Sequence, residues 1–306
     1  MPSSSLTNKK TLRFVITLAT GSFGSSSANQ VTLEGYRATA DIDNGGGQMN
    51  ATLRAQIYGV LQSDMNKVTT PWGPRLINRN TILVYAIDGA QETLVFAGDI
   101  VNAWGDYQQM PDVFLRIQAQ AGVINQLQPI APTSYNGAVD VATLIAQLAG
   151  TMGYKFENNG VSFQLSNPYV ANTGIEQVKS LAKAARIGWG LDNGVLFIVP
   201  AGTPRGSLIP LISAQTGMIG YPTYDSQGIN IRTLFNPALV FHGAFKVVSS
   251  VPRPVGSLDT QGAAIAPTPV GQWIAFSISH SLSSEKPGGP WFSTVRGNPS
   301  GFAISN

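Results

Sequence analysis

Short strand-like segments with polar and apolar residues in alternation characterise the first part of the chain. Residues 51–58 alternate strictly, which places Leu53, Ala55 and Ile57 on one face of a strand. Similar short segments follow one another closely, and no long helical period separates them. This pattern predicts a small antiparallel barrel or sandwich over residues 8–126.

A hairpin is predicted between two apolar runs of this region, residues 81–87 and 93–98. Asp88 and Gly89 stand between the runs. The Asp-Gly pair is typical of a tight hairpin turn, because both turn positions tolerate a positive φ.

A helical period replaces the strand pattern from about residue 127. Apolar residues recur at helical spacing over residues 141–148, with Asp140 as the expected N-cap, and again over residues 175–186. Residues 153–161 and 188–195 match with one deletion, each having a glycine, an aromatic residue and an Asn-Gly turn. We interpret residues 127–203 as a small α/β domain built from a duplicated helix-hairpin unit, with chance similarity as the alternative.

The chain returns to strand-like segments over residues 204–306. The predicted fold class is therefore mainly β with an α/β insert, in which two antiparallel β-barrel domains, residues 8–126 and 204–306, flank the domain of residues 127–203. The Pro-, Gly- and Ala-rich stretch at residues 251–270 has few large apolar side chains, so we expect it to be mobile or ordered by a partner.

Composition points to a chain that is partly covered by other subunits. Hydrophobic residues make up 43% of the sequence and charged residues only 11%, under half of the roughly 25% usual in soluble proteins. Isolated domains depend on surface charge for solubility. The net charge of +3 is small, so binding of nucleic acid through a charged surface is not indicated.

The sequence offers no recognisable constellation for catalysis. Its two histidines, His242 and His280, both fall in strand-like segments, and it has no cysteine. A nucleophile elbow and a phosphate-binding loop are both missing. The acidic stretch that begins at Asp41 resembles a calcium loop, but Thr52 stands where the bidentate glutamate is required. We therefore expect no catalytic residue, no cofactor and no metal site.

Targeting signals are also missing from the pattern. No stretch reaches the 18 or so apolar residues that a membrane span needs. The polar residues 1–10 do not have the form of a signal peptide. We expect the protein to be made and folded in the cytoplasm.

The last hundred residues carry an ordered series of short motifs. Thr-Gly-Met-Ile-Gly at residues 216–220 is followed by Leu-Phe-Asn-Pro at 234–237. A late Ser-His-Ser-Leu at 279–282 then precedes Gly-Gly-Pro-Trp at 288–291. This order resembles the baseplate hub proteins of contractile-tailed bacteriophages, and residues 53–59 and 96–100 resemble the first barrel of that family.

The resemblance implies an architecture and a role. Such hubs are homotrimers in which each chain contributes two β-barrel domains, so that six barrels form a pseudo-hexameric ring. The ring joins the hexameric tail tube to the trimeric central spike and encloses the channel through which DNA passes. It implies a structural, non-enzymatic virion protein, assembled in the host bacterial cytoplasm, with tube, spike and baseplate wedge proteins as partners.

Four residues are candidates for subunit interfaces, and each has a plainer alternative. Phe235 is a candidate anchor or a core residue. Trp72, in a rigid Pro-rich loop, is an exposed contact or the plug of a barrel end. Arg232 and Arg296 could pair across subunits or remain solvated at the surface.

Two other functions stay open at this point. The duplicated α/β unit could bind glycan or peptidoglycan, alone or beside a hydrolase, which would make the chain a cell-wall-binding or lytic tail protein. A soluble monomeric enzyme on a β scaffold is the third possibility, although no constellation supports it.

Overall fold

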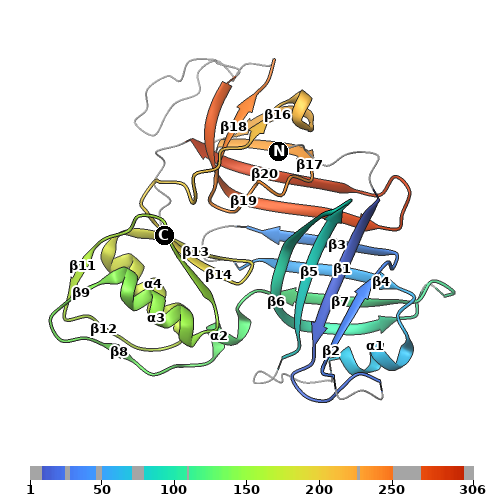
Figure 1. The fold of residues 1–306 in the computed structure, drawn as a ribbon, viewed down its shortest axis with the longest axis horizontal. Helices are drawn as coiled ribbons and strands as arrows, with labels where there is room; N and C mark the ends of the chain where they lie inside the picture. Colours follow the sequence, from blue (N-terminus) through green and yellow to red (C-terminus); the bar gives the residue numbers. More distant parts are fainter. Residues whose placement is uncertain are drawn as a thin grey trace.

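The chain folds into a mainly β structure with a small helical unit at its side (Figure 1). The computed structural model describes residues 9–24, 28–45, 50–70, 79–108, 110–225, 228–250 and 270–299. The stretch 251–269, most of the segment expected to be mobile, and Trp72 lie outside these residues.

The described residues of the N-terminal region form seven strands and two short helices. They are β1 (Lys10–Thr17), β2 (Gln30–Glu34), β3 (Ala38–Asn44), β4 (Thr52–Tyr58), β5 (Thr81–Asp88), β6 (Gln91–Asp106) and β7 (Phe114–Gln120), with α1 (Gln62–Val68) and α2 (Val123–Leu127).

Two predictions for this region are confirmed. Leu53, Ala55 and Ile57 of β4 are all buried, as the alternation indicated. Strands β5 and β6 form the predicted hairpin, in which Asp88 pairs with Gln91 and Gly89 has a φ of 62°.

The α/β unit comprises two helices and seven short strands. They are β8 (Thr133–Ser134), β9 (Ala138–Asp140), α3 (Val141–Thr151), β10 (Lys155–Asn158), β11 (Gln164–Ser166), β12 (Tyr169–Val170), α4 (Gly174–Ala185), β13 (Ile187–Asp192) and β14 (Val195–Pro200).

The two predicted helices are confirmed, with α3 beginning at its predicted cap. Asp140 accepts a hydrogen bond from the backbone N–H of Ala142, and Thr173 caps α4 by accepting one from Glu176. Each helix buries one apolar face against the strands.

The prediction of two equivalent helix-hairpins is wrong for the first of them. After α4, strands β13 and β14 form the expected antiparallel hairpin. After α3, strand β10 instead pairs in parallel with β14, and β11 pairs with β9 in a separate small sheet. The Asn-Gly turn after β10 therefore does not fold the chain back onto β10: the next strand, β11, pairs with β9, and the outer edge of β10 has no strand partner among the described residues.

The described residues of the C-terminal region form six strands. They are β15 (Leu211–Ile212), β16 (Met218–Asp225), β17 (Gly228–Leu234), β18 (Ala244–Val248), β19 (Val270–Ser284) and β20 (Trp291–Pro299), with a 3₁₀ turn at Ala214–Thr216.

A single 13-stranded sheet joins the N-terminal and C-terminal strands. Its path runs β16-β17-β20-β19-β3-β4-β7-β6-β5-β1-β2, with β18 and then β15 branching from β19. Strand β19 is the link, because its first part pairs with β18 and its last part pairs with β3. Among the described residues neither set of strands closes into a barrel, so the path remains open at β2, β15 and β16.

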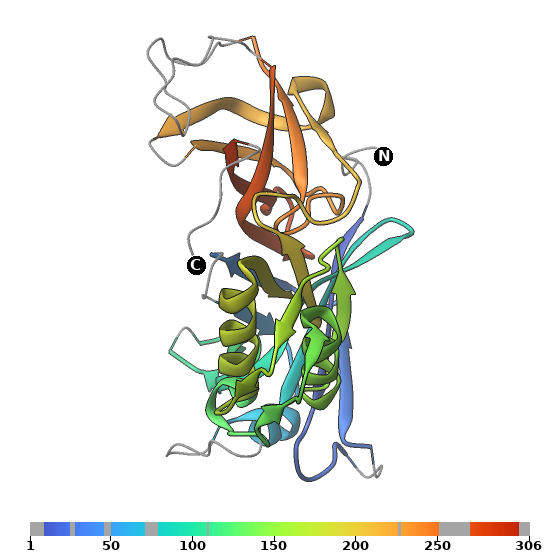
Figure 2. The same ribbon diagram turned by 90° about the vertical axis from the view of Figure 1, so that its left-hand side faces the viewer.

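The hydrophobic core also crosses between the parts of the chain. The largest cluster of buried residues extends from the N-terminal strands into α3 and α4, and it includes Phe235, Leu282 and Trp291 of the C-terminal part. A smaller cluster lies within the C-terminal strands. Figure 2 shows the α/β unit in front of the N-terminal strands, with the C-terminal strands above both.

Candidate functional site

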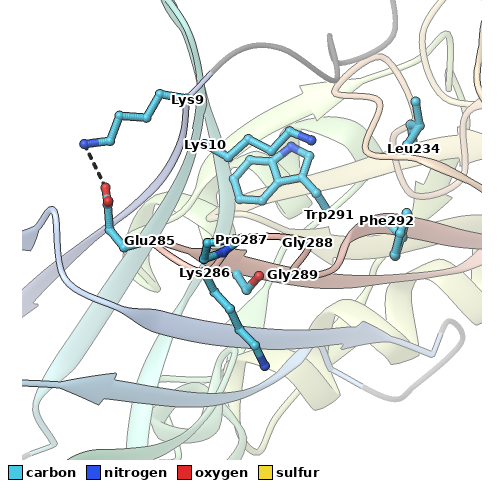
Figure 3. Close-up of a pocket in the computed structure, with 11 residues that line it drawn as sticks. Lys9, Lys10, Leu234, Glu285, Lys286, Pro287, Gly288, Gly289, Trp291 and Phe292 are labelled. Atoms are coloured by element: carbon cyan, nitrogen blue, oxygen red, sulfur yellow. Dashed lines mark ion pairs between the residues drawn. The ribbon is translucent and has the colours of Figure 1, made fainter.

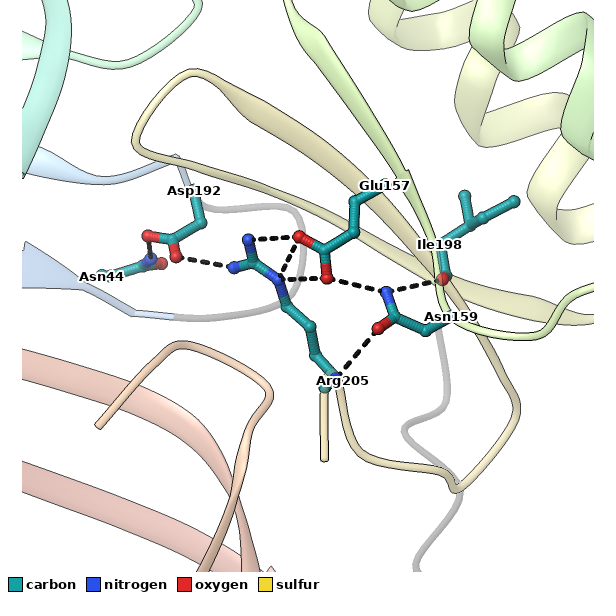
Figure 4. A network of polar contacts seen from close by, with 7 residues as sticks. Asn44, Glu157, Asn159, Asp192, Ile198 and Arg205 are labelled. Atoms are coloured by element: carbon teal, nitrogen blue, oxygen red, sulfur yellow. Dashed lines mark hydrogen bonds and ion pairs between the residues drawn. The ribbon is translucent and has the colours of Figure 1, made fainter. Parts of the chain in front are cut away.

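Arg205 lies where the three parts of the chain meet (Figure 4). Its Nη1 donates to Asp192 Oδ2 of β13 at 2.8 Å, and its Nη2 donates to Glu157 Oε2 of β10 at 2.9 Å. Nε adds hydrogen bonds to both oxygens of Glu157. One guanidinium group thus holds two acidic side chains from β10 and β13, the strands on either side of β14 in the small sheet of the α/β unit.

The same group is tied to the other two parts of the chain. Asn44, at the end of β3, approaches Asp192 Oδ1 with its Nδ2 at 3.5 Å. The backbone N–H of Arg205 donates to the carbonyl of His242, which lies in a turn before β18. We call Arg205, Glu157, Asp192 and Asn44 the Arg205 junction.

Burial makes the junction electrostatically stronger than a surface ion pair. The side chains of Arg205 and Asp192 are 11% and 15% exposed. Hydrogen bonding to Arg205 lowers the pKa of Glu157, whereas burial raises the pKa of Asp192 against the opposing charge of Arg205. An arginine stays protonated under these conditions, so the junction is suited to fixing positions and not to transferring protons.

Nothing in the sequence pattern singled out these residues, since residues 201–206 have the composition of a linker. The available signal was an isolated arginine between a proline and a glycine in a chain with few charges. Its partners lie 13 and 48 residues earlier in the sequence, so no local motif connects them.

Open sheet edges form a second candidate surface. Within the described parts of the chain, strands β2 and β16 end the path of the sheet, and β15 ends its branch. Tyr221 and Ile219, both on β16, are 65% and 36% exposed, and we call these two residues together with the outer edge of β16 the β16 surface. Further exposed apolar residues lie on or beside β15 and β18: Leu208, Ile209, Leu211 and Val248. Unpaired strand edges and exposed apolar side chains both favour association with another chain.

The predicted interface residues do not form one cluster. Phe235 is 3% exposed and packs edge-on against Trp291 and His280, with ring centroids 5.7 and 5.4 Å apart. It is therefore a core residue of the single chain, the alternative given for it above. Trp72 lies outside the described residues.

The two predicted arginines have contacts within their own chain. Arg296 pairs with Asp225 at 3.0 Å, and the guanidinium of Arg232 lies 4.4 Å from the ring centroid of Phe292. Both arginine side chains occupy the strand pair β17–β20 and remain partly exposed.

The histidines are held in the neutral form. Burial lowers the pKa of His280 to about 4 and also lowers the pKa of His242. His280 lies in a strand as predicted, but the prediction for His242 is wrong: it occupies a turn with a φ of 64°, because the chain reverses direction there before β18.

In the part of the chain that is described, potential metal-ligating side chains stay apart and the helices are short. There, no three His, Asp or Glu side chains gather closely enough to hold a metal ion. Of the helices in the same residues, none has the length and apolar character needed to cross a membrane.

Comparison with known proteins places the chain in a family. A sequence model described as "Baseplate hub gp41" matches residues 46–255, more than half of the chain. The chain belongs to the baseplate hub gp41 family. No match was found among curated proteins.

Solved structures share the fold of this hub protein at low sequence identity. The tail protein from Neisseria meningitidis MC58 superposes with a TM-score of 0.58 at 9% identity, covering 95% of this chain and 97% of that one. The 43 kDa tail protein of prophage MuSo2 from Shewanella oneidensis gives a TM-score of 0.54 at 10% identity, covering 94% and 98%. The similarity extends over both sets of strands and the α/β unit of the hub protein.

Proposed function

We propose that this hub protein is a structural subunit of a phage tail baseplate that assembles into a trimeric, pseudo-hexameric ring. The observation that carries the proposal is the continuous sheet with open edges, in a member of the baseplate hub gp41 family. In the proposed ring, the seven strands on one side of the β19–β3 junction and the six on the other serve as the two tube-like domains of each chain. Three chains then supply six such domains.

Within the baseplate the ring joins the hexameric tail tube to the trimeric central spike and contacts the surrounding wedge proteins. It encloses the channel for DNA, which passes without sequence-specific contacts. The protein is non-enzymatic, is assembled in the bacterial cytoplasm and belongs to the virion. The fixed placement of its parts by the β19–β3 pairing and the Arg205 junction supports this role, because an adaptor must keep two unlike partners in register.

The β16 surface gives the ring a means of assembly. An edge strand that a neighbour covers gains hydrogen-bond partners for its free backbone groups, and obligate interfaces commonly bury more than about 2,000 Å². Exposed Tyr221 and Ile219 would be covered in the same step.

Mass in solution tests the proposal, by light scattering coupled to size exclusion over a range of concentrations. We expect a particle of about three times 32.4 kDa, alone or when the spike protein is added. The double variant Ile219→Lys/Tyr221→Lys should dissociate it without changing the circular dichroism spectrum.

Tyr169→Lys is the matched control, because Tyr169 is 69% exposed in the α/β unit, away from the β16 surface. It should leave the mass unchanged. A chain that remains monomeric with both the tube and the spike protein present would overturn the proposed ring.

A further inference from the structure

A pocket of about 570 Å³ lies between the start of β1, the end of β17 and the turn that joins β19 to β20 (Figure 3). Its volume falls in the roughly 300–1,000 Å³ range of ligand sites. The wall combines apolar side chains with three lysines and one acidic residue, Glu285. The apolar residues are Leu234, Pro287, Trp291 and Phe292, and the lysines are Lys9, Lys10 and Lys286.

Ion pairs among the described residues do not balance the charges of this pocket. Lys9 pairs with Glu285 at 2.8 Å, which uses the acidic residue of the pocket. Lys10 and Lys286 have no ion-pair partner among the described residues. Asp88 is the cross-strand neighbour of Lys10, but its carboxylate makes no ion pair with it. Two positive charges therefore remain at the pocket.

A buried donor without a partner lies at the same place. Trp291 is 1% exposed, and its indole Nε1–H has no hydrogen-bond acceptor among the described residues. Buried donors are nearly always paired, so a missing acceptor calls for an explanation. Lys10 Nζ lies 6.0 Å from the centroid of the Trp291 ring, and both side chains line the pocket (Figure 3).

We propose that this pocket binds an acidic side chain from a polypeptide segment of another baseplate protein. One carboxylate oxygen accepts from Lys10 Nζ and the other from Trp291 Nε1–H, after a small movement of the Lys10 side chain that lies across the indole. Lys286 adds attraction at the rim. The carboxylate supplies the acceptor that both donors lack.

The apolar wall distinguishes a peptide from a free anion. Leu234, Pro287 and Phe292 offer surface to the residues beside the acidic side chain, and an inorganic ion would leave that surface unused. The inference stands on the pocket itself and does not require the proposed trimer.

Nuclear magnetic resonance tests the pocket directly, because the chain has only five tryptophans and each indole N–H gives one signal. The probes are the capped peptide Ac-Leu-Glu-Leu-NH₂, its neutral analogue Ac-Leu-Gln-Leu-NH₂ and inorganic phosphate, each added to the ¹⁵N-labelled full chain. The indole N–H signal of Trp291 is assigned by its disappearance in Trp291→Phe, or by its proximity to the Lys10 side chain.

We expect the glutamate peptide to shift the Trp291 signal, and the glutamine peptide and phosphate to leave it in place. Lys10→Gln should weaken the binding of the glutamate peptide about tenfold, because one charge-assisted hydrogen bond is lost. Lys155→Gln is the control, since it removes an equal charge from exposed β10. The remaining indole signals report that each variant is folded.

Other outcomes would overturn the inference. No shift with any probe, or equal shifts with both peptides, would show that the pocket does not recognise a carboxylate. A shift with phosphate equal to that with the glutamate peptide would assign the site to small anions. None of these results bears on the mass of the assembly. The proposed ring is therefore tested independently of the pocket.

Discussion

Arg205 shows how much of this molecule depends on single side chains where charges are few. Its guanidinium group satisfies Asp192 and Glu157 together, and Phe197 lies beneath it with a ring centroid 4.6 Å away. Without the arginine, the two carboxylates would lie next to each other without a counter-charge. Burial would further disfavour the charged form of Asp192.

Replacing the arginine should therefore destabilise the folded chain. We expect Arg205→Met to lower the free energy of unfolding by on the order of 3 kcal/mol, because it leaves a buried carboxylate without its partner. Urea denaturation of the purified protein measures the loss. Arg13→Met is the control: Arg13 holds two glutamates in a more exposed triad, and its loss should cost under about 1 kcal/mol. Equal effects would show that the junction is no stronger than a surface pair.

His280 predicts a loss of stability in acid. Its folded pKa of about 4 lies below the ordinary value of 6.5, since burial disfavours the charged ring. The unfolded chain therefore binds the proton more readily between these two pH values. His280 stabilises the fold fully above pH 6.5, and that contribution is lost as the pH falls toward 4.

The variant His280→Gln isolates the part of the acid-induced loss of stability that comes from His280. Between pH 7.5 and 4.5 the parent protein should lose about 2–3 kcal/mol more stability than this variant. The imidazole signal of His280 should titrate near pH 4 in the folded protein, and a midpoint near 6.5 would contradict the burial argument.

Among the elements, α3 depends on the residue that caps it, Asp140, which precedes its first turn. Asp140 Oδ1 accepts from the N–H of Ala142 at 3.2 Å and is also approached by the N–H of Phe163 at 3.4 Å. We expect Asp140→Ala to cost about 1 kcal/mol in the free energy of unfolding, because the first turn of the helix loses its cap. Asp140→Asn should retain most of the stability, since asparagine caps equally well. If the two variants behave alike, the cap does not stabilise α3.

Elements with a long regular pattern could be predicted from the sequence, and short ones could not. The helical spacing of apolar residues predicted α3 and α4 correctly, because each helix buries a continuous apolar face. Helices α1 and α2 are only seven and five residues long, too short for a period to appear. The hairpin after α3 was predicted from its turn residues, but β10 found its partner in β14, about 40 residues further along the chain. Local turn signals do not reveal such a distant pairing.

At the scale of the molecule, the sequence indicated β regions at both ends of the chain, but it did not indicate that their strands pair into one sheet. The pairing of β19 with β3 joins positions more than 200 residues apart, such as Ser281 and Asp41. The Arg205 junction was missed for the same reason, since its contacts also come from distant strands. Alternation shows which face of a strand is buried, but it does not identify the neighbouring strand.

Residues 204–306 should consequently fail to fold as a separate piece. Alone, β19 would expose the edge that β3 covers, and Phe235, Leu282 and Trp291 would lose part of the core in which they pack. We expect the fragment to be largely insoluble when expressed alone, and co-expression with residues 1–203 to recover soluble complex. A soluble fragment with its own cooperative unfolding transition would show that the C-terminal strands are independent.

The β19–β3 pairing also sets how the two sets of strands respond to mechanical force. Seven residue pairs, from Ile278–Asn44 to Ser284–Ala38, hold the two strands together. A pull along the strands loads all seven pairs in shear, so they must break together. A pull across the strands opens the pairs one after another from an end. The hub chain is therefore mechanically anisotropic, and it resists sliding of one half past the other far better than peeling.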